Sequence, residues 1–191
     1  MPGVWIIEPE PRGPESDWCA RILDVEELRA RGLDVDVVQC NSSFSSRRGT
    51  LRGMHYQAEP YGEPKLVCCL RGATFHVALD LRPQSPAYGC WHGTVLSAQS
   101  LRTLYLPPGV AHGLQTLVDD CEVFYQMGRR YVPEAARGVR WDDPAFAIQW
   151  PPVADGGARL LSERDRSFAY WGIAPTARAR RRSSRACSGA G

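Results

Sequence analysis

The feature that most constrains the fold of this chain is a series of short strand-like runs separated by closely spaced turn residues. Several runs alternate apolar with polar residues, which is the pattern of a half-buried β-strand. Turn signals such as Pro83-Gln84-Ser85-Pro86, Pro107-Pro108-Gly109 and Asp119-Asp120 lie between them. The runs cover residues 4–7, 35–39, 65–70, 74–81, 93–96, 102–106, 113–118 and 122–126. Many short strands at this spacing predict an all-β domain, either a β-sandwich or a barrel.

Helix signals are few. The segment Asp24-Val25-Glu26-Glu27 has the form of a capping box, and it predicts one short helix over about 24–31 that ends before Gly32. A further turn is expected at 133–137, and Ser162 is placed to cap another short turn. The helices are therefore expected to be short and peripheral.

The segments between the runs are predicted to be turns and loops. Arg71-Gly72-Ala73 separates two strand-like runs and predicts a hairpin. Residues 42–50 are polar, and residues 151–159 are rich in Pro and Gly, so both are expected to be loops.

Composition divides the chain into a body, residues 1–175, and a tail, residues 176–191. The tail holds five arginines, no acid and no aromatic residue, and it has too little apolar surface to order itself. Without these arginines the net charge of +2 becomes −3, so the body is mildly acidic. The body is long enough for a single domain with a hydrophobic core. An acidic body with a tail that lacks stacking aromatics disfavours nucleic acid as a partner.

Nothing in the sequence indicates a membrane protein or an exported one. No apolar run approaches the roughly 18 residues that suggest a membrane span, and the start MPGVWIIEPEPRG lacks the basic region of a signal peptide. The seven cysteines are an odd number without a CxxC pair, which indicates neither a disulfide framework nor a structural zinc site. We expect a cytoplasmic protein with reduced thiols.

Three histidines, His55, His76 and His112, lie in strand-like segments. Inward-facing positions of a small β domain converge on one cavity, so these imidazoles are candidates for a shared site. Gln57 alternates with His55 and is expected on the same face. Two chemistries remain open for the three histidines, acid–base catalysis or binding of a metal ion.

The side chains available suit removal of a proton next to a carbonyl group. A neutral histidine such as His55 can take a carbon-bound proton, and a carboxylate such as Asp165 can orient that imidazole. Tyr125 can return a proton from the opposite side. Lys65 can hold the developing enolate oxygen, and it is the single lysine among 23 basic residues. Where arginine is the default cation, a lysine suggests a position that arginine does not serve.

Several long motifs, in order along residues 34–166, give the chain its resemblance to a known family. They are GTLRGMHYQ, KLVCCLRGATFHVALDLRPQSPAYGCW, LYLPPGVAHGLQTL, VFYQM, WDDPAFAIQWP and LSERD. In these motifs the chain resembles the dTDP-4-dehydrorhamnose 3,5-epimerase family. The resemblance implies a cupin-type jelly roll with one or two short peripheral helices. It also implies a homodimer that works without metal or cofactor.

The resemblance further implies epimerisation of a dTDP-4-keto-6-deoxyhexose at C3, at C5 or at both, through enolates next to the C4 ketone. By their motifs, His55 resembles the base, Asp165 its paired carboxylate, Lys65 the enolate-stabilising lysine and Tyr125 the general acid. The remaining side chains are similar to groups that bind the nucleotide and sugar. We expect this substrate-binding set to contain Arg12, Gln39, Asn41, Arg52, Gln57, His76, His112 and Tyr131.

Two positions depart from the family pattern. The family usually reads FDV where this chain has Phe75-His76-Val77, so an imidazole replaces a carboxylate. The N-terminal RGFF of the family becomes Arg12-Gly13-Pro14-Glu15, which removes aromatic side chains that help to hold the nucleotide.

Three alternatives remain open, the first of them motivated by these departures. A family member redirected to another isomerisation or cyclisation substrate would keep the acid–base residues and bind dTDP weakly. A metal cupin would use His55, His76 and His112 as ligands. A jelly roll that only binds carbohydrate or serves as a scaffold would leave the polar residues without a catalytic role.

Overall fold

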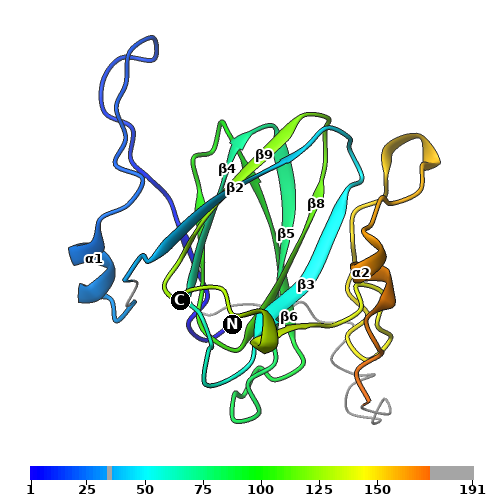
Figure 1. Cartoon of the computed structure of the whole chain (residues 1–191). Coiled ribbons are helices and arrows are strands. Elements are labelled where there is room, and N and C mark those ends of the chain that lie inside the picture. Colours follow the sequence, from blue (N-terminus) through cyan, green and yellow to red (C-terminus); the bar gives the residue numbers. More distant parts are fainter. Residues whose placement is uncertain (34–35, 173–191) are drawn as a thin grey trace.

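The computed structural model describes residues 1–33 and 36–172. Its strands form two five-stranded antiparallel sheets that pack face to face, as Figure 1 shows. In spatial order the first sheet contains β1 (Trp5–Ile7), β7 (Thr103–Leu106), β4 (Lys65–Arg71), β9 (Cys121–Met127) and β2 (Gln39–Ser45). The second sheet contains β10 (Ala136–Gly138), β3 (Leu51–Gln57), β8 (Val110–Thr116), β5 (Ala73–Asp80) and β6 (Trp91–Ser97). The predicted all-β jelly-roll sandwich is confirmed.

The space between the two sheets is apolar over part of its length and polar over the rest. The apolar part is a cluster to which both sheets contribute, because alternate residues of each strand point inward. Its buried members are Val67, Cys69, Ala78, Leu96, Leu104, Leu106, Val110, Leu114 and Val123. This packing holds the two sheets together, and three of its members, Val67, Leu114 and Val123, also line a cavity between them.

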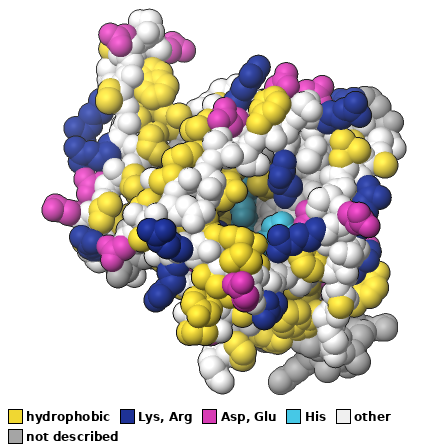
Figure 2. Space-filling view, in the orientation of Figure 1, with side chains coloured by type: hydrophobic (Ala, Val, Ile, Leu, Met, Phe, Trp, Pro, Cys, Tyr) yellow, Lys and Arg dark blue, Asp and Glu magenta, His cyan; other side chains and the backbone are white. Residues whose placement is uncertain are grey.

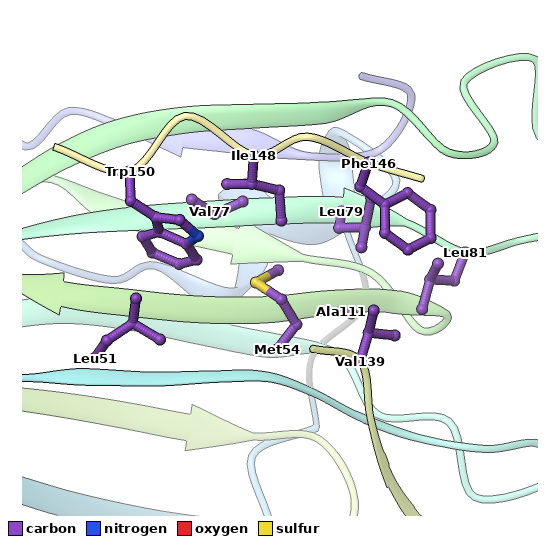
Figure 3. Close-up of a cluster of buried hydrophobic side chains, with 10 residues drawn as sticks. All are labelled: Leu51, Met54, Val77, Leu79, Leu81, Ala111, Val139, Phe146, Ile148 and Trp150. Atoms are coloured by element: carbon purple, nitrogen blue, oxygen red, sulfur yellow. The ribbon is translucent and has the colours of Figure 1, made fainter. Parts of the chain in front are cut away.

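The second sheet is covered on its outer face as well. Leu51, Val77 and Leu79 point outward from it and are fully buried under residues 139–150 (Figure 3). Trp150 in this covering segment donates its indole N–H to the carbonyl of Trp141. The second sheet is therefore a rigid layer with packed side chains on both faces, and rigid layers position functional groups well.

The helices are short and peripheral, as predicted. Helix α1 (Val25–Ala30) begins at Asp24, whose carboxylate accepts hydrogen bonds from the N–H groups of Glu26 and Glu27. Helix α2 (Glu163–Ser167) begins at Ser162, and its hydroxyl accepts from the N–H of Asp165. Two 3-10 turns, Pro133–Ala135 and Ala154–Gly156, complete the helical structure that is described. None of the helices described has the length and apolar character needed to span a bilayer.

Two predictions about the strands are wrong. The residues around Gly72 do not form a hairpin, because β4 belongs to the first sheet and β5 to the second. Gly72 has φ +78°, which suits a sharp corner between the sheets as well as a hairpin turn. The run 35–39 is not a strand over residues 36–38; the strand there, β2, begins at Gln39 and covers residues 42–45 of the segment predicted as a polar loop. Residue 35 and the predicted tail 176–191 lie outside the described residues.

An N-terminal arm, residues 8–24, extends away from the sandwich (Figure 1). Its two sides are joined by paired backbone hydrogen bonds between Arg12 and Cys19. It leads into α1, which packs through Leu28 against Leu66 and Tyr105 of the first sheet. The arm is thus anchored at its base and projects from the body of the protein.

Candidate active site

A cavity of about 490 Å³ opens between the two sheets, lined by residues of both and by the segment 160–165. Figure 2 shows histidine side chains at the bottom of a hollow on this face, with Lys or Arg side chains beside it. The predicted site residues that line the cavity are Arg52, His55, Lys65, His112, Tyr125 and Asp165. The structure therefore brings half of the predicted set, including all four predicted catalytic residues, into one cavity.

The two walls of the cavity carry different groups. His55 on β3 and His112 on β8 belong to the second sheet, where they are direct cross-strand partners. Lys65 on β4 and Tyr125 on β9 belong to the first sheet, and Tyr125 is the cross-strand partner of Val67, two residues along from Lys65. A flat molecule held between the sheets would meet an imidazole on one side and a phenol on the other.

A bulge in β3 brings Arg52 and His55 to the same cavity although they are three residues apart. The register between β3 and β8 shifts between these two residues. Gly53 lies inside the bulge with φ +124°, and a Cβ there would come within 2.5 Å of Gly113 Cα. Only glycine allows the two strands to approach so closely at this point.

His55 is paired with Asp165. Its Nε2 lies 2.6 Å from the Oδ1 of Asp165, and the carboxylate is 5% exposed whereas the imidazole is 39% exposed. Burial raises the pKa of Asp165, but the interactions with His55, with Ser162 and with the backbone of Gly53 together lower it by more, so the carboxyl is ionised. The ring of Phe168 meets His55 edge-on at 5.8 Å. The carboxylate and the phenyl ring together fix the orientation of the imidazole.

Lys65 has a carboxylate partner that the sequence analysis did not predict. Its Nζ lies 2.6 Å from Glu63 Oε1, and both side chains are largely buried. Glu63 also accepts a hydrogen bond from the amide of Gln57 at 2.9 Å. The one sequence signal for this ion pair was the spacing of Glu63 and Lys65, because residues two apart in an extended chain share a face.

His76 lies behind His112, away from the cavity. Its Nδ1 is 3.0 Å from His112 Nε2, its Nε2 is 2.7 Å from Thr74 Oγ1, and the two imidazole rings are stacked. Burial lowers the pKa of His76 to about 3 and that of His112 well below its ordinary value, with His76, Lys65 and His55 adding to the second shift. Both imidazoles are therefore neutral near pH 7.

Three other predicted binding residues form a cluster along β2 and after β9. Gln39 donates to the Oδ1 of Asn41 and accepts from the backbone N–H of Tyr131. Asn41 is the cross-strand partner of Tyr125 and lies two residues before Ser43, which lines the cavity. The cluster therefore continues the cavity wall along β2.

The remaining predicted binding residues lie elsewhere. Arg12 is on the projecting arm and does not line the cavity. Gln57 is buried, and its amide is occupied by Glu63, by two carbonyls and by the N–H of Val132. His76 is fully buried.

The three histidines do not assemble into a metal site. Within residues 1–33 and 36–172, no group of three His, Cys, Asp or Glu side chains is placed to hold a metal ion. His76 and His112 direct nitrogens at each other, and His55 directs one at Asp165. Both ring nitrogens of His76 and one each of His55 and His112 thus point to partners within the protein and not to a common centre.

The jelly-roll fold and this cavity define a cupin-like protein whose cavity has a carboxylate-paired imidazole on one wall and a phenol and an ammonium on the other. A family model described as dTDP-4-dehydrorhamnose 3,5-epimerase matches residues 1–171. The chain belongs to this family, whose members are isomerases.

Two curated relatives illustrate the range of the family. The dTDP-4-dehydrorhamnose 3,5-epimerase of Sinorhizobium fredii is 40% identical over 164 residues, which is 86% of this chain and 83% of the relative. The dTDP-4-dehydrorhamnose 3-epimerase of Streptomyces niveus is 41% identical over 167 residues, 85% of this chain and 77% of the relative.

A solved structure agrees with the fold. The dTDP-6-deoxy-D-glucose-3,5-epimerase of Legionella pneumophila, in complex with dTDP-4-keto-L-rhamnose, has a TM-score of 0.81 to this chain at 33% identity. The match covers 89% of this chain and 88% of that one.

Proposed function

We propose that this isomerase epimerises a dTDP-4-keto-6-deoxyhexose at C3, at C5 or at both, as a step in deoxysugar biosynthesis. The observation that carries the proposal is the placement of His55 and Tyr125 on facing walls of one cavity. Epimerisation removes a proton from one face of a carbon and returns a proton to the other face, so it needs an acid–base group on each side.

His55 is the base in this mechanism. Asp165 accepts the hydrogen bond of His55 Nε2–H, which leaves the lone pair of Nδ1 to take the proton. The electrons of the broken C–H bond form the enolate, with its negative charge on the C4 oxygen. The ionised Asp165 stabilises the imidazolium that results, and Tyr125 then delivers a proton to the opposite face.

Lys65 stabilises the enolate oxygen. Its ammonium is a compact donor at the cavity wall, next to the strand that carries Tyr125. A positive charge that is already held in place stabilises a developing oxyanion better than a charge that must first reorient. His112, which is neutral, adds a hydrogen-bonding group without adding charge.

The nucleotide is held outside the reacting centre. Arg52 lies at the cavity and carries a charge suited to a diphosphate. Gln39, Asn41 and Tyr131 continue the wall along β2 and offer amide, phenol and aromatic surfaces to a base and a sugar.

We propose further that the protein is a homodimer of the cytoplasm. Phe44 and Leu70 leave large apolar side chains exposed on the outer face of the first sheet. The six cysteines that the structure describes are free, as suits a reducing compartment. In a dimer the projecting arm would carry Arg12 to the cavity of the partner, where its charge can meet the diphosphate.

The test is proton exchange from solvent. After incubation with dTDP-4-keto-6-deoxyglucose in D₂O, NMR is expected to show deuterium at C3, at C5 or at both. His55→Ala is expected to abolish the exchange while it retains the fold, and His92→Ala, which alters an exposed histidine, is expected to exchange like the wild type. A folded wild-type protein that exchanges neither carbon would contradict the proposal.

The same spectra distinguish the alternatives. Exchange at C3 alone would make this chain a 3-epimerase, the activity named for the Streptomyces niveus relative. No exchange, together with weak dTDP binding by calorimetry, would favour a different isomerisation or cyclisation substrate. In that case the altered Arg12-Gly13-Pro14-Glu15 segment and His76 would mark where binding has changed.

A further inference from the structure

The ion pair between Glu63 and Lys65 is built into the cavity wall. Glu63 immediately precedes Pro64, and Lys65 opens β4, so the two side chains lie on one side of an extended segment. Their side chains are 4% and 14% exposed, and the two charged atoms are 2.6 Å apart. Lys65 lines the cavity, but Glu63 does not. Glu63 therefore acts on the cavity through its contact with the Lys65 ammonium.

Gln57 holds the carboxylate in place. The Oε1 of Gln57 accepts a 2.6 Å hydrogen bond from the backbone N–H of Val132, which fixes the amide orientation. With the amide oriented in this way, Gln57 Nε2 points toward Glu63 and donates a hydrogen bond to Glu63 Oε2 at 2.9 Å. A buried carboxylate is costly unless its oxygens have partners, and here one oxygen contacts the amide and the other the ammonium.

The other groups that face Lys65 provide no competing anion. On the second sheet, His112 is neutral and His55 is engaged with Asp165. On the neighbouring strand of the first sheet the facing group is Tyr125, a phenol. Glu63 is thus the carboxylate in direct contact with the ammonium in the described part of the site.

We propose that Glu63 is a positioning residue: held by Gln57, it keeps the Lys65 ammonium directed into the cavity, and so places the enolate-stabilising cation. This inference rests on the proposed function for the role of Lys65, but the ion pair itself can be tested without any substrate.

The single lysine makes a direct measurement possible. Acetic anhydride reacts with neutral amines, and Lys65 is the only lysine in the sequence, so its acetylated peptide reports on this one side chain. Without the ion pair to Glu63 the Lys65 side chain is no longer held in one position, so its amine is more accessible to the reagent. Glu63→Gln is expected to accelerate Lys65 acetylation about tenfold or more, as measured by peptide mass spectrometry, because it breaks a largely buried ion pair. The control Glu134→Gln, which removes an exposed acid, is expected to label like the wild type.

Activity supplies the second readout. Glu63→Gln is expected to lower kcat with little change in KM, because the ammonium is no longer held toward the enolate oxygen. Glu63→Asp keeps the charge on a shorter side chain and is expected to be intermediate in labelling and in kcat. If Glu63→Gln does not fold, this second variant still decides between the outcomes.

The failure of the inference and of the proposed function can be told apart. Folded Glu63 variants that label Lys65 at the wild-type rate, with unchanged kcat, would overturn the inference. A wild-type protein without epimerase activity would overturn the proposed function. Faster labelling in Glu63→Gln would then still support the control of Lys65 by Glu63.

Discussion

At the scale of single residues, Lys65 is the group whose chemistry is hardest to replace. An ammonium is compact and presents three donors, whereas a guanidinium is planar, larger and directed in a fork. Lys65→Arg is expected to keep the charge and the fold but to reduce kcat about 10- to 100-fold, because the larger head cannot occupy the position beside Glu63. The rate of deuterium incorporation into the sugar measures this.

The exchange Arg71→Lys is the matched control, because Arg71 lies at the far, exposed end of the same strand. It is expected to leave turnover unchanged. A fully active Lys65→Arg protein would mean that the single lysine reflects composition alone and has no part in the chemistry.

His76 gives the molecule a pH-dependent stability. Burial lowers the pKa of His76 to about 3 in the folded state, against 6.5 for an ordinary histidine. Between these values the unfolded chain binds a proton that the folded chain does not, so the free energy of unfolding falls as the pH drops below 6.5. At pH 5 the contribution of this one residue corresponds to a loss of about 2 kcal/mol.

The variant His76→Gln is expected to lose less stability between pH 7 and pH 5 than the wild type, by about 2 kcal/mol. Urea unfolding at the two pH values measures this difference. His112 titrates in the same direction and remains in the variant, so part of the dependence persists. His92→Gln serves as the control: His92 is exposed, and although partial burial and the N-terminal charge lower its pKa too, its removal is expected to reduce the pH dependence by less than His76→Gln does. Parallel loss of stability in wild type and His76→Gln would contradict the prediction.

At the scale of the element, the main role of helix α2 is to position Asp165 next to His55. The hydroxyl of Ser162 caps this one-turn helix by accepting the N–H of Asp165 itself. Ser162→Ala is expected to cost about 1 kcal/mol of stability. It is also expected to lower kcat several-fold, because the loosened turn no longer holds the carboxylate at 2.6 Å from His55.

Asp24→Ala is the matched control for the cap. Asp24 caps α1 with the same chemistry, but α1 packs on the outside of the first sheet. The control is expected to lose similar stability by thermal unfolding with unchanged kcat. Equal activity in the two variants would show that the cap of α2 does not position Asp165.

The helices and strands also show which structural features a local sequence pattern can predict. The caps at Asp24 and Ser162 were predictable because a cap depends on residues within one turn. The corner at Gly72 was not, because a glycine with positive φ serves a hairpin and a crossing between sheets equally well. The polar β2 was mistaken for a loop because its inward residues face a polar cavity and not the apolar core.

The candidate site likewise contains residues that were predictable from the sequence and residues that were not. His55, Lys65, Tyr125 and Asp165 were expected together from their motifs, and the fold does bring them to one cavity. Glu63 was not expected, because its role depends on contacts with Gln57 and Lys65 that only the folded chain makes. Likewise His76 was expected at the substrate, whereas tertiary packing places it behind His112.

At the scale of the whole molecule, the outer face of the first sheet is the predicted dimer interface. Phe44 and Leu70 are each 53% exposed there. Replacing both with Glu is expected to convert a dimer into a folded monomer, because buried, unpaired carboxylates oppose association. Analytical ultracentrifugation measures the mass. Val95→Glu, at an exposed apolar position of the second sheet, is expected to remain dimeric. A monomeric wild type would contradict the predicted interface.

If the arm of one subunit completes the site of the other, two defective variants should complement each other. Arg12→Ala damages the arm and His55→Ala damages the cavity. In a mixed dimer, the cavity of the Arg12→Ala subunit keeps its own His55 and receives an intact arm from the His55→Ala subunit. The second cavity then has both defects, so one site in two is restored.

Activity is measured at substrate concentrations below KM, because there the loss of the Arg12 contact with the diphosphate lowers the rate most. Equal mixtures of the two variants, dissociated and reassociated, contain about half mixed dimers, so about a quarter of all sites should have wild-type activity. If the arm served its own subunit, every site in the mixed dimer would retain one defect and mixing would restore nothing. Arg12 lies outside the cavity of its own chain, and complementation would therefore make the dimer, and not the single chain, the unit that binds the nucleotide.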